Sequence, residues 1–453
     1  MPAPADIHYA RTSDGIDVAY TVFGKGPDLL FAPGFVTHLD LMWDFPAFKA
    51  MLRLAESFRM IVFDKRGTGL SDRSLGFGSL EERTEDIRAV LDETGSEQAI
   101  LYGVSESGPM CTYFAATHPE RVRALALYGT FARFDESLPL PYGRDRKRAS
   151  SGAEWIDWIG SEWSKGDVYQ RFMSGPADEA AVKRVLARYE RGACTPQMAR
   201  EIMTRNLEMN VEPMLAAIRA PTLVMHVDGD PVVHVEHGRR LAAGIPGARY
   251  FERHGDYHGT WRHEDIVAMG IPLAEFLSEI VGGDSSARGQ PGTEREIATV
   301  LFTDIVDSTR RAGEMGDAAW RSLLDEHDTV ALRAVSSAGG KLIKMTGDGL
   351  LATFSGPSRA LSAVRELQEA VALLGVSIRA GVHTGEIERR ADDIGGMGVH
   401  IAARIAELAR GGEVLVSSTA RDLAVGSRVL FDPRGSYELK GVPQAWHVFA
   451  VQG

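Results

Sequence analysis

The chain has 453 residues, of which 44% are hydrophobic and 25% are charged, and its formal net charge at pH 7 is −12. A chain of this length exceeds one ordinary hydrophobic core, so we expect two domains. The acidic balance argues against general affinity for nucleic acid, whose phosphates bind basic surfaces. No apolar run reaches the roughly 18 residues that a spanning helix needs, so we expect no membrane span.

The cysteine content and the N-terminal residues indicate the compartment. The two cysteines, Cys111 and Cys194, are too few for a disulfide framework and fit a reducing environment. The first residues, Met-Pro-Ala-Pro-Ala-Asp, lack the basic segment and apolar core of a secretory signal. We therefore expect a cytoplasmic protein.

Residues 7 to about 130 alternate short apolar segments with helical stretches. The apolar segments predict strands at residues 16–22, 29–32, 60–63, 99–102 and 124–128. Strands that alternate with helices are typical of an α/β domain with a mainly parallel sheet. We expect residues 1–282 to form this domain, with residues of about 131–215 inserted as a helical lid.

A strand–turn–helix segment supplies a candidate nucleophile. The predicted strand 99–102 ends in Gly103-Val-Ser-Glu-Ser-Gly108, and a helix-like run follows. Small residues flank a serine in this way where the turn is too tight for side chains, so Ser105 is the candidate. The usual second glycine of the G-x-S-x-G pattern is Ser107 here, which departs from the motif but is small enough to be tolerated.

Residues further along the chain supply partners for the serine. Asp230 follows a predicted late strand, and His258 comes after it. In this chain order an acid orients an imidazole, and the imidazole takes the hydroxyl proton. Asp228 is an alternative acid, and His254 is an alternative base.

Two backbone amides are candidates for an oxyanion hole. Phe35 follows an early strand in Pro33-Gly-Phe35, and Glu106 follows the candidate nucleophile. Together with the loop Asp64-Lys-Arg-Gly-Thr-Gly-Leu-Ser-Asp72 and the Ser–Asp–His order, the segment of about residues 7–280 resembles the α/β-hydrolase superfamily. The resemblance implies an α/β-hydrolase fold that either hydrolyses an ester or binds a ligand as a scaffold.

The inserted lid carries three tryptophans in a helical-looking stretch: Trp155, Trp158 and Trp163. We expect them to pack the lid, with the alternative that some line a pocket for a small apolar ligand or ester. Three histidines show no metal-binding spacing, and we expect scattered surface positions for them: His226, His234 and His237.

Residues 283–294 are rich in Gly, Ser and Pro and predict a linker to a second domain, residues 295–453. In that domain an apolar run, 297–302, reads as a strand that ends near Asp304, and residues 341–354 read as a hairpin with Asp348 at its turn. Two such aspartates can share a pair of metal ions. Hard divalent cations prefer carboxylate and phosphate oxygen, which suits phosphoryl or nucleotidyl transfer.

The remaining pattern predicts the architecture of this second domain. Helical stretches at 318–337 and 358–374 and a strand at 377–382 give the order strand–helix–strand–strand–helix–strand. This order is that of a ferredoxin-like α+β core.

Five segments in order resemble the class III nucleotidyl cyclases across essentially the whole catalytic domain. They are Leu-Phe-Thr-Asp-Ile-Val-Asp-Ser-Thr at 301–309, Lys-Met-Thr-Gly-Asp at 344–348, Gly-Val-His-Thr-Gly-Glu at 381–386, Asp-Ile-Gly-Gly-Met-Gly-Val-His-Ile-Ala-Ala-Arg at 393–404 and Tyr-Glu-Leu-Lys-Gly at 437–441. The resemblance implies attack of a ribose 3′-oxygen on the α-phosphate of a nucleoside triphosphate, with release of pyrophosphate. It also implies two ions of Mg²⁺ or Mn²⁺ in each site.

The resemblance assigns roles to individual residues. The implied metal ligands are the carboxylates of Asp304 and Asp348 and the carbonyl of Ile305. Lys344 and Asp393 stand where the family recognises adenine, because lysine donates to the ring N1 and aspartate accepts from the 6-amino group. ATP is therefore the expected substrate, and cyclic AMP the expected product.

Three further positions match or depart from the family. Arg404 matches the arginine that stabilises charge on the α-phosphate, and Lys440 matches a lysine that contacts the terminal phosphates. His400 replaces the usual asparagine, although histidine can still donate to a ribose oxygen. Because one chain carries both half-sites, the resemblance implies a homodimer with two composite sites.

Three hypotheses about function remain open at this stage. In the first, the chain is an adenylyl cyclase whose hydrolase-like domain is a sensor or a second enzyme. In the second, it is a carboxylic-ester hydrolase with a weak or vestigial cyclase. In the third, both domains bind without turnover, as a nucleotide-responsive scaffold.

Overall fold

The computed structural model describes residues 6–74, 76–135, 137–141, 148–174, 179–282, 294–390, 393–427, 429–443 and 445–452. The chain divides into two compact units, residues 1–288 and 289–453. The predicted linker, 283–294, lies outside the described residues except for Glu294, at which a strand begins. Among the helices within these ranges, none combines the length and the apolar character that a membrane crossing requires.

The first unit is built on an eight-stranded sheet with the order β1-β2-β4-β3-β5-β6-β8-β9. Its strands are β1 (His8–Arg11), β2 (Asp17–Gly24), β3 (Asp28–Ala32), β4 (Arg59–Phe63), β5 (Ala99–Val104), β6 (Val122–Tyr128), β8 (Thr222–Val227) and β9 (Arg249–Arg253). The pairs from β4 to β9 are parallel, whereas β2 pairs antiparallel with β1 and with β4. The predicted mainly parallel sheet is confirmed.

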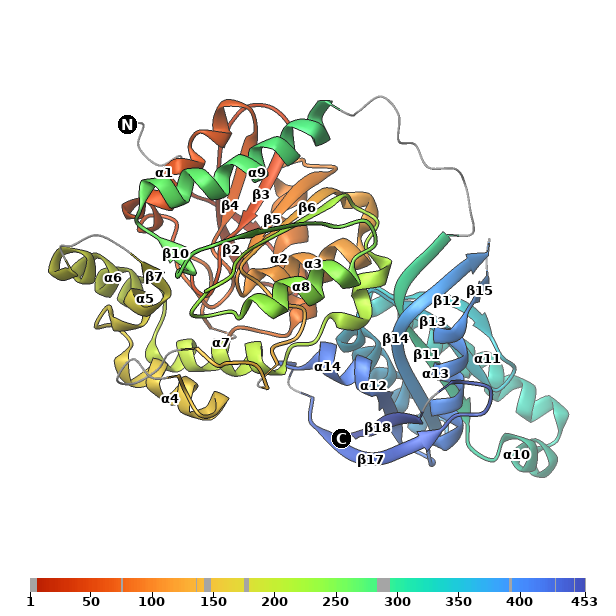
Figure 1. The fold of residues 1–453 in the computed structure, drawn as a ribbon. Helices are drawn as coiled ribbons and strands as arrows, with labels where there is room; N and C mark the ends of the chain where they lie inside the picture. The colour runs from red at the N-terminus through yellow and green to blue at the C-terminus, as the bar shows by residue number, and fades with distance from the viewer. Residues whose placement is uncertain are drawn as a thin grey trace. The chain divides into compact units, whose positions relative to one another are not determined.

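Helices cover this sheet because its central strands are apolar on both faces; every residue of β8, for example, is buried. The covering helices are α1 (Pro46–Met51), α2 (Leu80–Glu93), α3 (Ser107–Thr117), α8 (Val235–Gly244) and α9 (His263–Gly282). Within this cover α1 contacts α9, and α2 contacts α3. The result is the α/β-hydrolase fold that the sequence predicts (Figure 1).

Among the described residues between β6 and β8, four α-helices gather at one side of the sheet (Figure 1). They are α4 (Gly152–Glu162), α5 (Asp167–Phe172), α6 (Glu179–Ala193) and α7 (Pro196–Glu208). A short strand after α5, β7 (Met173–Ser174), pairs in parallel with β10 (Gly259–Thr260). This pairing ties the inserted helical lid to the chain directly after His258.

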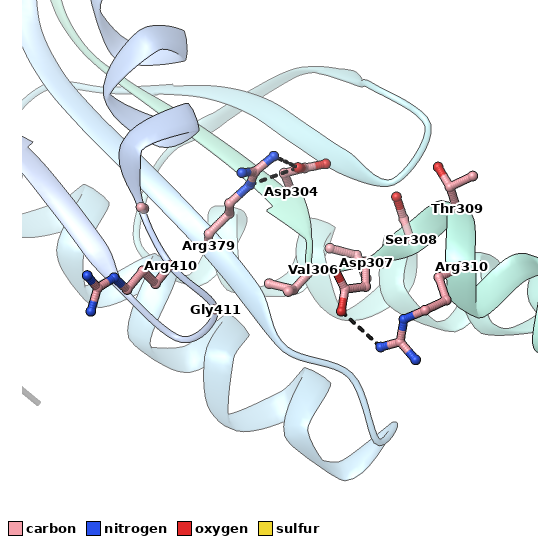
Figure 2. A pocket seen from close by; sticks show the side chains of 11 residues that line it. Asp304, Val306, Asp307, Ser308, Thr309, Arg310, Arg379, Arg410 and Gly411 are labelled. Atoms are coloured by element: carbon pink, nitrogen blue, oxygen red, sulfur yellow. Dashed lines mark hydrogen bonds and ion pairs between the residues drawn. The ribbon is translucent and has the colours of Figure 1, made fainter.

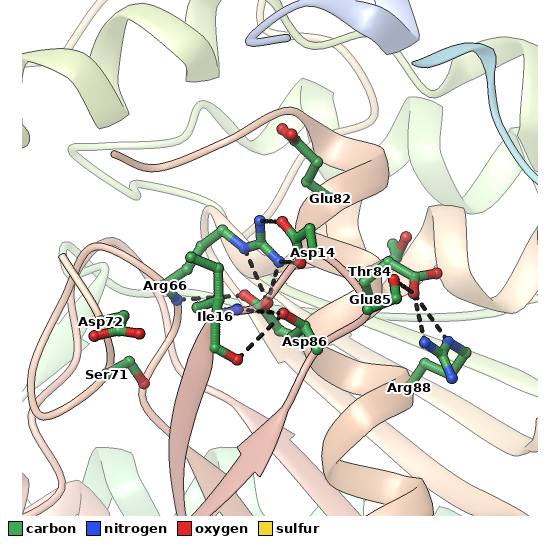
Figure 3. A network of polar contacts seen from close by, with 12 residues as sticks. Asp14, Ile16, Arg66, Ser71, Asp72, Glu82, Thr84, Glu85, Asp86 and Arg88 are labelled. Atoms are coloured by element: carbon green, nitrogen blue, oxygen red, sulfur yellow. Dashed lines mark hydrogen bonds and ion pairs between the residues drawn. The ribbon is translucent and has the colours of Figure 1, made fainter. Parts of the chain in front are cut away.

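A buried ion-pair network fixes the loop that follows β4 (Figure 3). Arg66, in this loop, places one guanidinium nitrogen 2.7 Å from Asp86 of α2 and another 2.7 Å from Asp14, which lies between β1 and β2. The side chains of Arg66 and Asp86 are almost fully buried. Because a buried charge is costly without its partner, this network holds the loop 64–72 in one place against α2.

The second unit also contains an eight-stranded sheet, with the order β12-β13-β11-β14-β16-β18-β17 and with β15 paired to β14. The strands are β11 (Glu294–Ile305), β12 (Lys341–Met345), β13 (Gly349–Phe354), β14 (Ile378–Arg390), β15 (Asp393–Gly395), β16 (Val414–Ser417), β17 (Phe431–Glu438) and β18 (Ala445–Val451). The first four are joined by antiparallel pairs. Their order confirms the predicted ferredoxin-like core.

Helices cover both faces of the second sheet. They are α10 (Ser308–Met315), α11 (Asp317–Ser337), α12 (Pro357–Leu373), α13 (Met397–Leu408) and α14 (Ser418–Ala424). Leu301 and Ile305 of β11 join the core formed with α11 and α12, whereas Ala298 and Val300 join a core with α13. Alternate residues of β11 thus face opposite layers. The strand ends at Ile305, directly after Asp304.

Candidate active sites

The structure brings Ser105, His258 and Asp230 together as one hydrogen-bonded chain. The Ser105 Oγ lies 2.8 Å from the His258 Nε2, and the His258 Nδ1 lies 2.7 Å from the Asp230 Oδ2. The other oxygen of Asp230 accepts hydrogen bonds from the backbone of Val232 and Val233. An ionised Asp230 therefore selects the tautomer with hydrogen on Nδ1, which leaves Nε2 free to accept the serine proton.

The backbone at Ser105 has the strained conformation of a nucleophile elbow. Ser105 joins β5 to α3 with a φ of 52°, in the left-handed region that residues with a side chain rarely adopt. Gly34 lies very close to Ser105, because a Cβ added to Gly34 would lie 2.6 Å from the Cβ of Ser105. The sharp turn lifts the serine hydroxyl out of the sheet toward His258.

The two predicted oxyanion donors flank this serine on different segments. Glu106 is the residue at the N-cap of α3, where backbone N–H groups are unpaired within the helix and point outward. Phe35 follows β3 and also has a positive φ, 48°. Both positions are suited to present an N–H to a developing anion.

The lid brings aromatic rings onto the loop that carries Phe35. The ring of Phe35 packs edge-to-face on Trp163 with 5.4 Å between centroids, and Tyr169 and Phe172 lie at 6.1 and 6.0 Å. Of the three tryptophans, Trp163 is therefore the one in contact with the ring of Phe35. Trp155 stacks on Phe134 within the first unit, which is the packing role expected for the lid.

The alternative acid and base pair with each other away from the serine. The exposed His254 lies 2.9 Å from the Oδ2 of Asp228. The expectation of surface positions for the other histidines is wrong for two of the three, because His226 and His237 are buried. The ring of His226 is hydrogen-bonded to the carbonyl of Val233. His226 is buried because β8, the strand that carries it, is covered on both faces.

A cavity of about 530 Å³ lies at the end of β11 in the second unit (Figure 2). It is lined by Asp304, Ile305, Val306, Asp307, Ser308, Thr309, Arg310, Arg379, Ala409, Arg410 and Gly411. Two of the three predicted metal-binding positions, Asp304 and Ile305, line it, and the backbone N–H of Ile305 donates to the carbonyl of the third, Asp348.

The position of Asp348 follows from a hairpin and a close backbone approach. β12 ends at Met345 and β13 begins at Gly349, as predicted, with Asp348 in the turn. Gly349 pairs with Asp304 across the sheet, and a Cβ on it would lie 1.9 Å from the carbonyl oxygen of Thr303. A glycine is therefore needed here for the turn to reach Asp304.

The donor chemistry of this site fits a hard divalent cation. Burial raises the pKa of Asp304, the Arg379 guanidinium opposes that change, and the nearby Asp348 carboxylate adds to it. Two neighbouring carboxylates of this kind are stabilised by a cation between them. The described ranges contain no group of three or more His, Cys, Asp or Glu side chains that could hold a metal ion, so an ion here would complete its shell with backbone, water or phosphate oxygen.

Arg379 is a site residue that the sequence analysis missed. Its Nη2 and Nε lie 2.6 and 3.0 Å from the Oδ2 of Asp304 (Figure 2). The contact arises from the antiparallel register of β11 and β14, in which Asp304 is opposite Arg379. Because the two residues are 75 positions apart in the sequence, only knowledge of the pairing of β11 with β14 could have revealed their contact.

The other predicted cyclase residues lie outside that cavity. Lys344 of β12 forms a salt bridge of 2.7 Å with Asp393 of β15, so the structure joins the two predicted adenine-binding side chains. Arg404 of α13 pairs with Glu407 at 2.6 Å. His400 and Lys440 are exposed. None of the five predicted nucleotide-binding residues, Lys344, Asp393, His400, Arg404 and Lys440, lines the cavity at Asp304.

Comparison with known families matches each unit separately. Residues 27–149 match the model of the alpha/beta hydrolase fold, and residues 292–453 match that of the adenylate and guanylate cyclase catalytic domain. "Putative carbamate hydrolase RutD" of Azorhizobium caulinodans is 30% identical over 253 residues, which are 54% of this chain and 88% of that protein.

Two further similar proteins are named as cyclases. "Putative adenylate cyclase 3" of Rhizobium meliloti is 28% identical over 164 residues, which are 34% of this chain but only 28% of that longer protein. The crystal structure of the adenylyl cyclase CyaB from P. aeruginosa is 22% identical and aligns with a TM-score of 0.34, covering 36% of this chain and 97% of that one.

Proposed function

Since the chain belongs to both the α/β-hydrolase family and the class III adenylyl/guanylyl cyclase family, we propose that it converts ATP to 3′,5′-cyclic AMP and pyrophosphate. The observation that carries this proposal is the cavity at the end of β11, where Asp304 and Arg379 meet beside Asp348. Paired carboxylates and a guanidinium are the groups that bind a metal–triphosphate complex.

Asp304 and Asp348, with the Ile305 carbonyl, hold the metal ions in this proposal. Two ions of Mg²⁺ or Mn²⁺ would lower the pKa of the ribose 3′-hydroxyl and neutralise the leaving pyrophosphate. Arg379 binds the Oδ2 of Asp304 and lines the same cavity. Its guanidinium would lie beside the triphosphate of a bound nucleotide, where its planar fork could bind two oxygens.

The remaining residues act from a second copy of the chain. The adenine-binding pair Lys344 and Asp393, and the ribose and phosphate residues His400, Arg404 and Lys440, do not line the cavity that contains Asp304. A two-fold dimer would place these residues of one copy opposite the cavity of the other. Arg404 would stabilise charge on the α-phosphate, and the imidazole of His400 would donate to a ribose oxygen.

The base preference provides a specific test. Glu at position 344 would accept from the guanine N1–H, and Ser at position 393 would donate to the guanine O6. We expect the Lys344→Glu/Asp393→Ser variant to lose at least about 100-fold in rate with ATP and to prefer GTP. Formation of cyclic AMP from ATP and of cyclic GMP from GTP, at equal nucleotide concentrations, measures this change.

A matched control changes the same charge on the same strand. Lys341 is also exposed on β12, three residues before Lys344. Lys341→Glu should therefore keep the preference of the wild-type protein for ATP. If the double variant also kept that preference, Lys344 and Asp393 would not be the residues that read the base.

A second activity, the hydrolysis of a carboxylic ester, is favoured by the geometry of Ser105, His258 and Asp230. The serine oxygen would attack the carbonyl carbon while Nε2 of His258 takes the hydroxyl proton. The amides of Phe35 and Glu106 would stabilise the resulting anion. The aromatic rings of Trp163, Tyr169 and Phe172 around Phe35 favour a small apolar ester as the substrate.

A further inference from the structure

Three charged side chains are buried directly beneath the nucleophile elbow. Lys65 pairs with one carboxylate oxygen of Glu106, and Arg83 pairs with the other. Their side chains are 0%, 1% and 2% exposed for Lys65, Arg83 and Glu106. Burying such a cluster is costly, and an apolar substitute is often at least as stable. Stability alone therefore does not account for this cluster, whose other contacts extend to the loop at Phe35.

The remaining contacts of Lys65 reach the oxyanion loop. Its Nζ lies 3.1 Å from the carbonyl oxygen of Phe35 and 3.1 Å from the Oγ of Ser107. Burial lowers the pKa of Lys65, with the Glu106 carboxylate acting against that change. The three groups around Nζ can all accept a hydrogen bond, and an ammonium has three donors to offer them.

Ser107 extends this contact to the other end of the loop. Its hydroxyl accepts from Lys65 and donates to the carbonyl oxygen of Pro33 at 2.5 Å. The loop Pro33–Gly34–Phe35 is thus held at both of its ends, by Lys65 directly and by Ser107.

The loop needs such restraint because it is strained beside the nucleophile. Phe35 holds a left-handed φ of 48°, an unfavourable conformation that persists only when its surroundings enforce it. The loop and the N-terminus of α3 carry the two proposed oxyanion donors, Phe35 and Glu106. Lys65 contacts both of these residues.

We propose that Lys65 and Ser107 form a clamp that fixes the oxyanion-hole amides of Phe35 and Glu106 relative to Ser105. This inference rests on the hydrolase activity proposed above. It gives a physical reason for serine in place of the usual second glycine of the motif, because glycine has no hydroxyl to join Lys65 to Pro33. Lys65 and Ser107 are positioning residues, which do not touch the ester.

Two variants test the clamp with little disturbance of the fold. Lys65→Met leaves Arg83 paired with Glu106, so that one cation faces one carboxylate. Ser107→Gly removes the hydroxyl and restores the smaller residue of the motif. Lys183→Met, at a half-exposed lysine of the lid that pairs with Asp167, is the matched control for loss of a lysine.

The readouts are kcat and KM for p-nitrophenyl butyrate and the inhibition constant of phenylboronic acid, which forms a tetrahedral adduct on serine. Loss of one oxyanion donor costs about 10²–10³-fold in kcat, so we expect a misplaced donor to cost about 10–100-fold in both clamp variants. KM should stay within about twofold, because ground-state binding does not use the oxyanion hole. The inhibition constant should rise in parallel with the loss of kcat.

The outcomes separate the clamp from the hydrolase activity itself. A fluorophosphonate that labels Ser105 in the wild-type protein would show that the serine is reactive. If kcat were then unchanged in the folded clamp variants, the clamp alone would be overturned. A change confined to KM or to the melting temperature would also overturn it, since a purely structural role predicts that result. Absence of labelling and of ester turnover in the wild-type protein would overturn both proposals. If Lys65→Met does not fold, Ser107→Gly carries the same test.

Discussion

Asp304→Ala and Arg404→Ala are each expected to lower cyclic AMP formation by at least about 10³-fold. A mixed dimer of one Asp304→Ala chain and one Arg404→Ala chain should nevertheless be active. The reason is that Asp304 and Arg404 serve the same site from different chains. In a mixed dimer one site lacks both residues and the other is intact. Co-expression in equal amounts gives mixed dimers for half of the population, so about a quarter of wild-type activity should return.

The matched control pairs Asp304→Ala with Asp348→Ala. These residues serve one site from the same chain, because the hydrogen bond of Ile305 and the pairing of Gly349 place them side by side. Their mixed dimer has one defect in each site and should stay inactive. Rescue in this control, or no rescue between Asp304→Ala and Arg404→Ala in a verified mixed dimer, would contradict the composite site.

Ser105→Ala should abolish ester hydrolysis, with kcat lowered by about 10⁴–10⁶-fold, because it removes the atom that His258 activates. Cyclic AMP formation by the same preparation should be unchanged, which also verifies that the variant is folded. Release of p-nitrophenol from short-chain esters and cyclic AMP formation from ATP measure the two activities side by side.

Histidine variants sharpen this second prediction. His258→Ala should lose ester hydrolysis to a similar extent as Ser105→Ala, since the two residues act as a unit. His254→Ala should have no effect, because that imidazole pairs with Asp228 and not with the serine. Ester turnover that survives Ser105→Ala would assign the hydrolysis to another group and remove the basis for the clamp.

Local patterns predicted much of the fold and of both sites. The strand, turn and helix around Ser105 could be read from the sequence because each is set by neighbouring residues. The same holds for the hairpin that carries Asp348, whose turn depends on Gly347 and Gly349. The order of the acid and the histidine after Ser105 then restricted which residues could form a triad with it. Asp228 remained an alternative acid and His254 an alternative base until the geometry was known.

Contacts across the sheets could not be predicted in this way. Arg379 reaches Asp304 through the register of two long strands, and Lys65 meets Glu106 from 41 positions away. Neither pair leaves a local pattern. A shift of β11 against β14 by two residues would keep the same side chains on the same faces, so the apolar alternation alone does not fix which residue lies opposite Asp304. The burial of His226 and His237 was missed for the same reason, since a polar residue type predicts exposure unless its partners are known.

The most direct test of the proposed cyclase is formation of cyclic nucleotide by the purified full-length protein. ATP and GTP would be supplied separately with Mg²⁺ or Mn²⁺, and with a chelator as the control. We predict cyclic AMP from ATP that depends on the metal ion, and far less cyclic GMP from GTP. Absence of cyclic AMP with either metal ion, from protein that is folded and dimeric, would contradict the proposed function.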